Sequence, residues 1–194
     1  MEILQHILFL DRDGTLIREP EDFRVSTVEK LVWLPDAITA LAALQRGGFR
    51  FVMVSNQDGL GKPDFPQNEF DIPQQHLLQI LGDHDVHFDA VLVDHHRAEE
   101  NHPDRKPNPG MVLNWLNGRS LDTTSCWVIG DRRTDAWLAH NLGIQSLTIN
   151  DPLSANGDAK FPNIPEAPTT KFYHWLDLFA FLRPHCPSPI LDSL

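Results

Sequence analysis

The stretch "LFLDRDGTLI", residues 8–17, decides the fold, because an apolar run leads directly into Asp11, Asp13 and Gly14. Carboxylates are almost never fully buried without partners, and two of them this close repel one another unless a cation lies between them. Open α/β sheets bind their ligands at the C-terminal ends of their strands. The aspartate pair therefore predicts a metal ion at the end of a buried strand.

Further segments of the chain predict a parallel sheet around this strand. Five short runs are apolar on both faces, as strands of parallel sheets are. They are "HILFL" (6–10), "FRFVMV" (49–54), "FDAVLV" (88–93), "CWVIG" (126–130) and "QSLTI" (145–149).

The segments between these runs have helical periodicity, and Pro or Gly marks most of their ends. They are "PDAITALAALQRGG" (35–48), a helix from Pro73 to about Leu81, "PGMVLNWLNG" (109–118), and a helix from Thr134 or Asp135 to Gly143. Strands that alternate with helices predict an α/β fold with a doubly wound, mostly parallel sheet of the Rossmann type.

The length of 194 residues suits one domain with a sizeable core. We expect the main domain over residues 1–150. Residues 151–170 are rich in Pro, Ala, Asn and Asp and predict a loop or linker. Residues 171–194 begin with the predicted amphipathic helix "KFYHWLDLFAFLRP" and end in a tail, and both should pack on the same domain.

The composition disfavours several classes of function. A net charge of -11 and a pI near 5.2 disfavour nucleic acid as a partner and suit a metal ion or a cationic small molecule. Cys126 and Cys186 alone supply neither a disulfide framework nor a thiolate cluster. No signal peptide and no apolar run of about 18 residues is visible, so we expect a soluble cytoplasmic protein without membrane contact. A weak homodimer is compatible with the sequence.

Two more strand ends carry residues that suit a phosphate site. In "VMVSNQDG" (52–59), Ser55 and Asn56 follow a strand and, with backbone N–H groups, form a neutral anion cradle. In "RKPNPG" (105–110), Lys106 supplies a point charge for a phosphate or a neighbouring carboxylate. Taken singly, a polar turn and a surface lysine are the commoner explanations of these residues.

The stretch "VIGDRRTD" repeats the pattern of the first strand end. Asp131 follows a glycine directly and is placed for a metal ion, whereas Asp135 either caps the next helix or binds Lys106. For Asp11 a turn or helix cap is the alternative to a nucleophile or metal ligand. All four signals fall at the C-terminal ends of strands in one predicted sheet. Oxygen ligands with room for water predict Mg²⁺ between protein carboxylates and a substrate phosphate.

Taken together, "DRDGT", "SNQ", "RKP" and "GDRRTD" resemble the four signature motifs of the haloacid dehalogenase superfamily of phosphohydrolases, over roughly residues 6–150. More narrowly, "DRDGTLIREPEDFRV", "SNQDGLG" and "VIGDRRTD" resemble the histidinol-phosphate phosphatase domain that some bacteria fuse to imidazoleglycerol-phosphate dehydratase, of which no sequence follows here. The resemblance implies a phosphatase of histidine biosynthesis that acts on a small phosphorylated metabolite. No large insertion follows the first two motifs, so we expect no separate cap domain.

The resemblance also implies a two-step reaction. Asp11 would attack phosphorus to form an aspartyl-phosphate, and Asp13 would first protonate the leaving alkoxide and then activate water. Mg²⁺ would be held by Asp11, the backbone carbonyl of Asp13 and Asp131, with Asp135 behind them. The expected phosphate ligands are Thr15, Ser55, Asn56, Arg105 and Lys106. This division suits phosphoryl transfer, which depends on positioning and on neutralising the phosphoryl oxygens.

One loop departs from the family pattern. Close relatives carry a structural zinc on three cysteines and a histidine ahead of the lysine motif, whereas "DHHRAEENHPDRKP" contains no cysteine. An ungapped overlay places the four ligand positions at Asp94, His96, His102 and Asp104. Imidazole and carboxylate both bind Zn²⁺, so a degenerate zinc site is one hypothesis and solvated surface histidines are the other.

The same loop and "REPEDFRV" (18–25) should form the walls of the substrate pocket. Glu19, Glu21 and Asp22 could bind the ammonium or imidazolium group of histidinol phosphate, and a solvated acidic turn is the alternative. Two other functions compete with this one. The first is a D-glycero-D-manno-heptose 1,7-bisphosphate phosphatase, which shares the motifs, and the second is a non-catalytic phosphate-binding regulatory domain.

Overall fold

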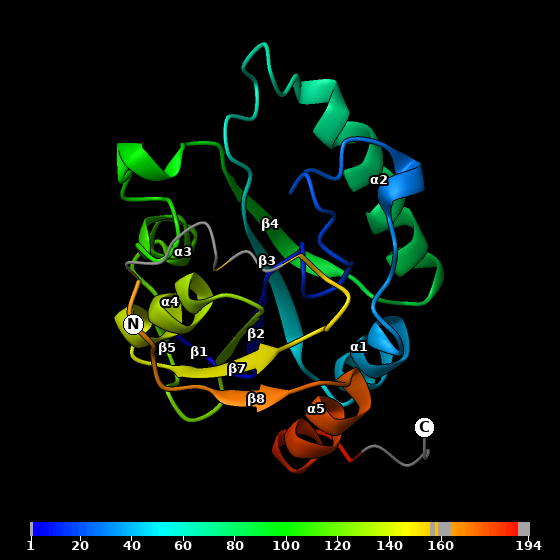
Figure 1. Ribbon diagram of the computed structural model, residues 1–194. Coiled ribbons are helices and arrows are strands. Elements are labelled where there is room, and N and C mark those ends of the chain that lie inside the picture. The colour runs from blue at the N-terminus through cyan, green and yellow to red at the C-terminus, as the bar shows by residue number, and fades with distance from the viewer. Residues whose placement is uncertain (1, 156–157, 159–163, 190–194) are drawn as a thin grey trace.

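Six parallel strands form the central sheet in a computed structural model that describes residues 2–155, 158 and 164–189 (Figure 1). The strands are β2 (Ile7–Leu10), β3 (Arg50–Asn56), β4 (Phe88–Asp94), β6 (Trp127–Gly130), β7 (Gln145–Ile149) and β8 (Thr170–Phe172). Their order is β4-β3-β2-β6-β7-β8, so the chain builds outward from β2 to one edge and then from β6 to the other. This is the doubly wound Rossmann order, with its switch point between β2 and β6. The predicted fold class and all five predicted strands are confirmed.

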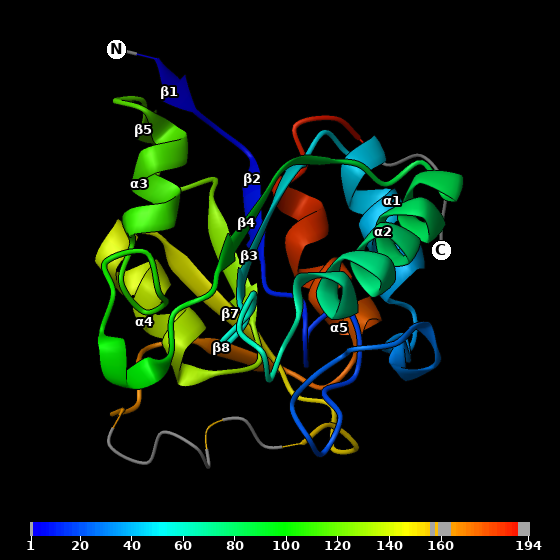
Figure 2. The same cartoon turned by 90° about the horizontal axis from the view of Figure 1, so that it is seen from above.

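Helices cover both faces of the sheet, as Figure 2 shows from above. On one face lie α1 (Ala37–Arg46), α2 (Gln67–Asp83) and α5 (Trp175–Leu182), and on the other lie α3 (Gly110–Leu116) and α4 (Arg133–Leu142). The remaining elements are the short strands β1 (Ile3–Leu4) and β5 (Ser120–Leu121), which pair with each other, and the 3-10 turns η1 (Val28–Lys30), η2 (Ala98–Glu100) and η4 (Arg183–His185).

Strand β2 is buried on both faces, which explains its continuous apolar sequence. Leu8 and Leu10 pack in the core on the side of α1 and α5, whereas Ile7 and Phe9 pack on the side of α3 and α4. The strand therefore has no solvent-facing side, and Asp11 is the first polar residue after it. Burial of the strand thus fixes where the first aspartate of the motif lies.

The predicted start of α2 at Pro73 is wrong. The helix begins at Gln67, and Pro73 lies inside it. Phe70, Pro73, Leu77 and Leu81 form one buried stripe along this helix. Burial of that stripe outweighs the single backbone hydrogen bond that a proline removes.

The predicted start of the last helix at Lys171 is also wrong, because Thr170–Phe172 form a strand and the helix begins at Trp175. Residues Thr170–Phe172 pair with Leu147–Ile149 and complete the sheet as β8. Helix α5 then begins at Trp175, which is fully buried in the core. Backbone groups at the free edge of β7 offer hydrogen bonds that a helix starting at Lys171 would leave unused.

The predicted loop over 151–170 packs on the body wherever it is described. Asp151 forms an ion pair with Arg18 at 2.8 Å, and the backbone N–H of Ala155 donates to the Glu19 carbonyl. Residues 156–157 and 159–163 of this loop, and 190–194 of the expected tail, lie outside the described residues.

In the described part of the chain, the segments that follow β2 and β3 form no separate cap domain. None of the described helices combines the length and the apolar character needed to cross a membrane.

Candidate active site

The switch point of the sheet brings the first and last motifs together. Strands β2 and β6 are paired, with Leu10 opposite Ile129, and the backbone N–H of Asp11 donates to the Ile129 carbonyl at 2.9 Å. Asp131 follows Gly130 at the end of β6. As a result, one carboxylate oxygen each of Asp11, Asp131 and Asp135 lie within 4.8 Å of one another.

Lys106 supplies the positive charge of this cluster. Its Nζ lies 2.6 Å from Asp11 Oδ1 and 2.7 Å from Asp135 Oδ1, and it donates to the Val54 carbonyl at 2.7 Å. Burial alone would lower the pKa of Lys106, but the carboxylates of Asp11 and Asp135 outweigh it and raise that pKa above its ordinary value. The lysine is therefore a fixed cation between two acidic motifs.

The carboxylates of Asp11 and Asp131 are buried and lack a full set of partners. Burial raises the pKa of Asp11 although Lys106 opposes it. The pKa of Asp131 is raised well above its ordinary value, first by burial and then by the charges of Asp11 and Asp135. Among the described residues, the buried Oδ1 of Asp131 also has no hydrogen-bond partner. Three crowded carboxylates with an unpartnered oxygen fit a hard divalent cation such as Mg²⁺.

Two glycines allow the acidic side chains to pack directly on backbone. Gly14 has a φ of +83°, and a Cβ added there would lie 2.2 Å from Asp131 Oδ2. A Cβ added at Gly130 would lie 2.2 Å from Asp135 Cγ. Any larger residue at either position would push a carboxylate away from the cluster.

Asp135 fulfils both of the alternatives that its sequence position allows. Its Oδ2 accepts a hydrogen bond from the backbone N–H of Arg132 at 3.1 Å and so caps α4, while its Oδ1 contacts Lys106. The residue thus connects the start of α4 to the lysine motif.

Asp13 has partners that the sequence reasoning did not identify. Its Oδ2 accepts a hydrogen bond from Gln57 Nε2 at 2.7 Å, and the same Nε2 lies 2.8 Å from Ser55 Oγ. Its Oδ1 accepts from Arg12 at 2.9 and 3.1 Å. Gln57 is the last residue of "SNQ" and Arg12 is the second residue of "DRDGT". Their positions inside the two motifs are the sequence signal that could have identified them as site residues.

Two of the expected phosphate ligands also hydrogen-bond to protein groups. Asn56 donates to the Lys106 carbonyl at 3.0 Å and accepts from the Lys106 backbone N–H at 3.1 Å, so its amide holds the lysine loop. The guanidinium of Arg105 donates to Asp58 Oδ1 at 2.6 Å and to the His96 carbonyl at 2.8 Å. Both side chains therefore organise the loop around Lys106.

Thr15 is fully buried at the turn after the aspartates. Its Oγ1 has no hydrogen-bond partner in the described part of the chain, which leaves the hydroxyl available to a ligand. Its carbonyl accepts a hydrogen bond from Trp175 Nε1 at 2.9 Å. The first residue of α5 thus contacts the active-site turn directly.

A cavity of about 280 Å³ opens over the two aspartates of the first motif. Its lining residues are Asp11, Asp13, Glu19, Asp22, Phe23, Arg24, Asn56, Gln57, Asp58, Phe65, Lys106, Arg132 and Thr134. Of the three acidic residues expected in its wall, Glu19 is buried and forms an ion pair with Arg132, and Asp22 forms one with Lys30. Glu21 is exposed and lies outside the set of lining residues.

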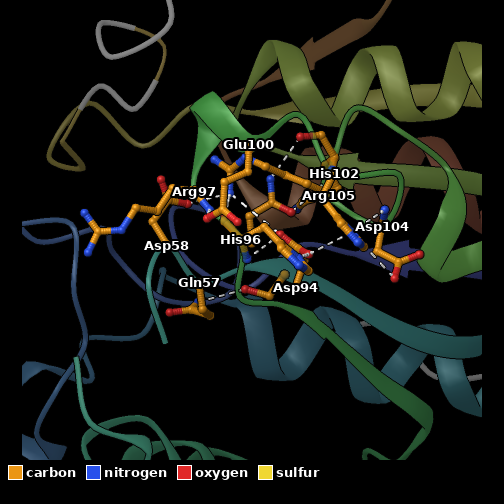
Figure 3. A network of polar contacts seen from close by, with 12 residues as sticks. Gln57, Asp58, Asp94, His96, Arg97, Glu100, His102, Asp104 and Arg105 are labelled. Atoms are coloured by element: carbon orange, nitrogen blue, oxygen red, sulfur yellow. Dashed lines mark hydrogen bonds and ion pairs between the residues drawn. The ribbon is translucent and has the colours of Figure 1, made fainter. Parts of the chain in front are cut away.

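The loop after β4 gathers three of the four expected zinc-ligand positions (Figure 3). Asp94 is buried, and its Oδ1 lies 2.7 Å from His96 Nδ1 and 4.0 Å from His102 Nδ1. The two imidazole rings are stacked with centroids 3.5 Å apart. Asp104 Oδ2 lies 3.8 Å from His102 Nδ1, at the edge of the group.

Comparison with known proteins agrees with the motifs. A family model described as HAD-hydrolase-like matches residues 104–170. The chain is 50% identical over 145 residues to the histidine biosynthesis bifunctional protein HisB of Baumannia cicadellinicola subsp. Homalodisca coagulata, which covers 74% of this chain and 41% of that protein. It is 41% identical over 161 residues to HisB of Stenotrophomonas maltophilia strain R551-3, and this match covers 83% of this chain and 45% of that protein. The chain thus spans less than half the length of these relatives.

Solved structures share the fold over nearly the whole chain. The TM-score is 0.75 against the D,D-heptose 1,7-bisphosphate phosphatase of B. bronchiseptica crystallised with magnesium and phosphate, at 22% identity and with 94% of this chain and 98% of that one covered. It is 0.72 against a protein from Mesorhizobium loti described as a HAD-like phosphatase, at 25% identity and with 97% and 91% covered. The family model, the relatives and the fold agree with the four motifs, and each of them shows that the chain is similar to the haloacid-dehalogenase-like phosphatases.

Proposed function

We propose that the chain is a Mg²⁺-dependent phosphomonoester hydrolase that converts L-histidinol phosphate and water to L-histidinol and phosphate through an aspartyl-phosphate. One observation carries the proposal. The buried ammonium of Lys106 lies between Asp11 and Asp135, with the carboxylate of Asp131 beside them and Asp13 facing the same cavity. A structural ion pair alone would not require the third carboxylate or a cavity above it.

The donor set suits Mg²⁺. Asp11 and Asp131 would hold it together with the backbone carbonyl of Asp13, and the ion would give the unpartnered Oδ1 of Asp131 a partner. Bound there, the ion would neutralise charge on the nucleophile and on the phosphoryl oxygens.

The residues of the chain divide the chemistry between them. The carboxylate of Asp11 attacks phosphorus, and Lys106 neutralises a phosphoryl oxygen beside it. Asp13 gives a proton to the leaving alkoxide oxygen and then takes one from the water that hydrolyses the aspartyl-phosphate. Ser55 and Thr15 have buried hydroxyls and are the further proposed ligands of the phosphoryl group.

The substrate is proposed from the relatives and from the cavity wall. The relatives are named for histidine biosynthesis. Asp22 and Asp58 line the cavity beside Phe23 and Phe65, a combination of carboxylates and rings that suits a cationic, partly apolar alcohol. A heptose bisphosphate carries no cationic group and would gain nothing from those carboxylates.

Phosphate release from histidinol phosphate and from D-glycero-D-manno-heptose 1,7-bisphosphate, each with and without Mg²⁺, tests the substrate. We expect turnover of histidinol phosphate only, and a preference for the heptose would reassign the enzyme. Asp11→Asn should lower turnover by several orders of magnitude, because it removes the nucleophile. Asp36→Asn is the matched control, since Asp36 is exposed at the start of α1. Phosphate binding without turnover of any phosphomonoester would favour the regulatory domain instead.

We also propose that Asp94, His96 and His102, with Asp104 beside them, hold a zinc ion. The support is the grouping of their ligand atoms within 4.8 Å for the first three residues. Elemental analysis of protein prepared without a His tag should find about one equivalent of zinc, and His96→Ala should lose it. His84→Ala, outside the loop, is the control. Zinc well below one equivalent in the unmodified protein would end this hypothesis.

A further inference from the structure

Arg12 is a fully buried arginine between the two aspartates of the first motif. Its Nε and Nη2 both donate to Asp13 Oδ1, at 3.1 and 2.9 Å. Its Nη1 donates to Gln74 Oε1 at 3.2 Å, and its guanidinium carbon lies 4.8 Å from the centroid of the Phe70 ring. Two sides of the guanidinium are thus occupied by α2, and the third is occupied by Asp13.

Gln74 is held in turn from the strand beside it. It is nearly fully buried, and its Nε2 lies 3.3 Å from Met53 Sδ on β3. Neither Arg12 nor Gln74 is among the residues that line the cavity. Both therefore act on the site only through Asp13, behind the surface that a substrate touches.

The two oxygens of Asp13 differ in their surroundings. Oδ1 faces the buried guanidinium, whereas Oδ2 is bound by Gln57, which lines the cavity. A guanidinium keeps its charge in proteins, so the N–H groups on Oδ1 are permanent donors. Oδ2 is the oxygen that remains for exchanging a proton with a substrate.

We propose that Arg12, anchored by Gln74, is a positioning residue that fixes Asp13 so that Oδ2 alone serves as the acid and base atom. The inference rests on the proposed function, in which Asp13 protonates the leaving alkoxide. Without the guanidinium, the carboxyl group is held by Gln57 alone and can rotate about its Cβ–Cγ bond, so that either oxygen can turn away from the leaving group. Proton transfer then suffers more than phosphate binding does.

The test uses the leaving group as the probe. An alkyl phosphate needs a proton on its departing oxygen, whereas p-nitrophenolate leaves without one. We expect Arg12→Met to lower kcat/KM for histidinol phosphate by about 100-fold and for p-nitrophenyl phosphate by less than about fivefold. Inhibition by orthophosphate should stay within about twofold of the unmodified enzyme, because Arg12 lies outside the cavity lining.

Gln74→Met is the second variant and keeps the charge of Arg12 while removing its anchor. It should show the same selective loss at about five- to tenfold, and it carries the test alone if Arg12→Met does not fold. Gln67→Met, on the exposed side of α2, is the control and should match the unmodified enzyme.

Asp13→Asn distinguishes the positioning role of Arg12 from the proposed acid and base role of Asp13. If Asp13→Asn loses the alkyl phosphate selectively while the Arg12 and Gln74 variants lose both substrates equally or neither, the positioning role is overturned and the proposed function stands. If Asp13→Asn itself shows no selectivity, the proposed role of Asp13 falls and the inference falls with it. Selective loss in all three supports both.

Discussion

Replacing Gly14 by alanine should inactivate the enzyme while leaving it folded. Gly14 has a φ of +83°, and the added Cβ would lie 2.2 Å from Oδ2 and 2.4 Å from Cγ of Asp131. Gly118 offers a matched control, because its φ is +80° and nothing lies within 4 Å of an added Cβ. The two variants share the backbone strain, and only Gly14→Ala collides with a proposed metal ligand.

The structure sets the size of each effect. A side chain in the left-handed region costs about 1–2 kcal/mol, and a chain of this size loses about 2–4 °C of Tm per kcal/mol. Both variants should therefore melt a few degrees early. Ordinary contact with a Cβ begins at 3.4 Å, so either Asp131 or the turn that carries Asp11 must retreat by about 1 Å. A displacement of that size costs roughly 100-fold in rate.

The assay is phosphate release over a series of Mg²⁺ concentrations, with Tm measured on the same samples. Gly14→Ala should lose about 100-fold in kcat/KM relative to Gly118→Ala and need more Mg²⁺ for half-maximal activity. Equal activity of the two variants at equal Mg²⁺ would refute the close packing of Asp131 on the backbone of Gly14.

Three further perturbations follow from the same contacts. Lys106→Met removes the partner of two buried carboxylates and should lower the free energy of unfolding by about 3–5 kcal/mol in urea titrations at neutral pH. The raised pKa of Asp131 means that the folded state keeps a proton that the unfolded state has lost. Without metal, the free energy of unfolding therefore falls as pH rises above 3.8, by up to about 1.4 kcal/mol per pH unit for this group. Asp131→Asn should reduce the slope in urea titrations with a chelator and leave the part that the raised pKa of Asp11 contributes. Trp175→Phe deletes the donor to the Thr15 carbonyl and also leaves a gap in the core, so it should cost more than the roughly 0.5–1.5 kcal/mol of a hydrogen bond in the same titrations, and more than Trp137→Phe, whose indole bond lies at the surface.

The strands and the acidic cluster could be predicted because both depend on short-range patterns. A run that is apolar on both faces has few uses other than a buried parallel strand, and the C-terminal ends of such strands share one edge of the sheet. The sequence therefore predicts that Asp11 and Asp131 lie close together, and the structure places their carboxylates in one cluster. The helix boundary at Gln67 was missed because Pro73 is a strong local signal that burial of one helix face overrides.

The partners of individual polar side chains could not be predicted in the same way. The sequence suggests Asn56 and Arg105 as phosphate ligands, but it does not show that their side chains also bind the Lys106 backbone and Asp58. Strand β8 was missed because it is short, half exposed and joined to a helical pattern. Arg12 was missed because a sequence does not distinguish a buried arginine from a solvated one.

The charges at the switch point lead to one more expectation. Asp11, Asp131 and Asp135 carry three negative charges when ionised, and Lys106 carries one positive charge, which leaves a cluster of net charge -2. Arg12 does not alter this balance, because it is paired with Asp13. A divalent cation neutralises the ionised cluster, whereas a phosphate dianion that enters without one meets either uncompensated negative charge or carboxyl groups that must first take up protons. Calorimetric titration with orthophosphate should therefore detect binding only when Mg²⁺ is present, and equally tight binding in a chelator would contradict this charge balance.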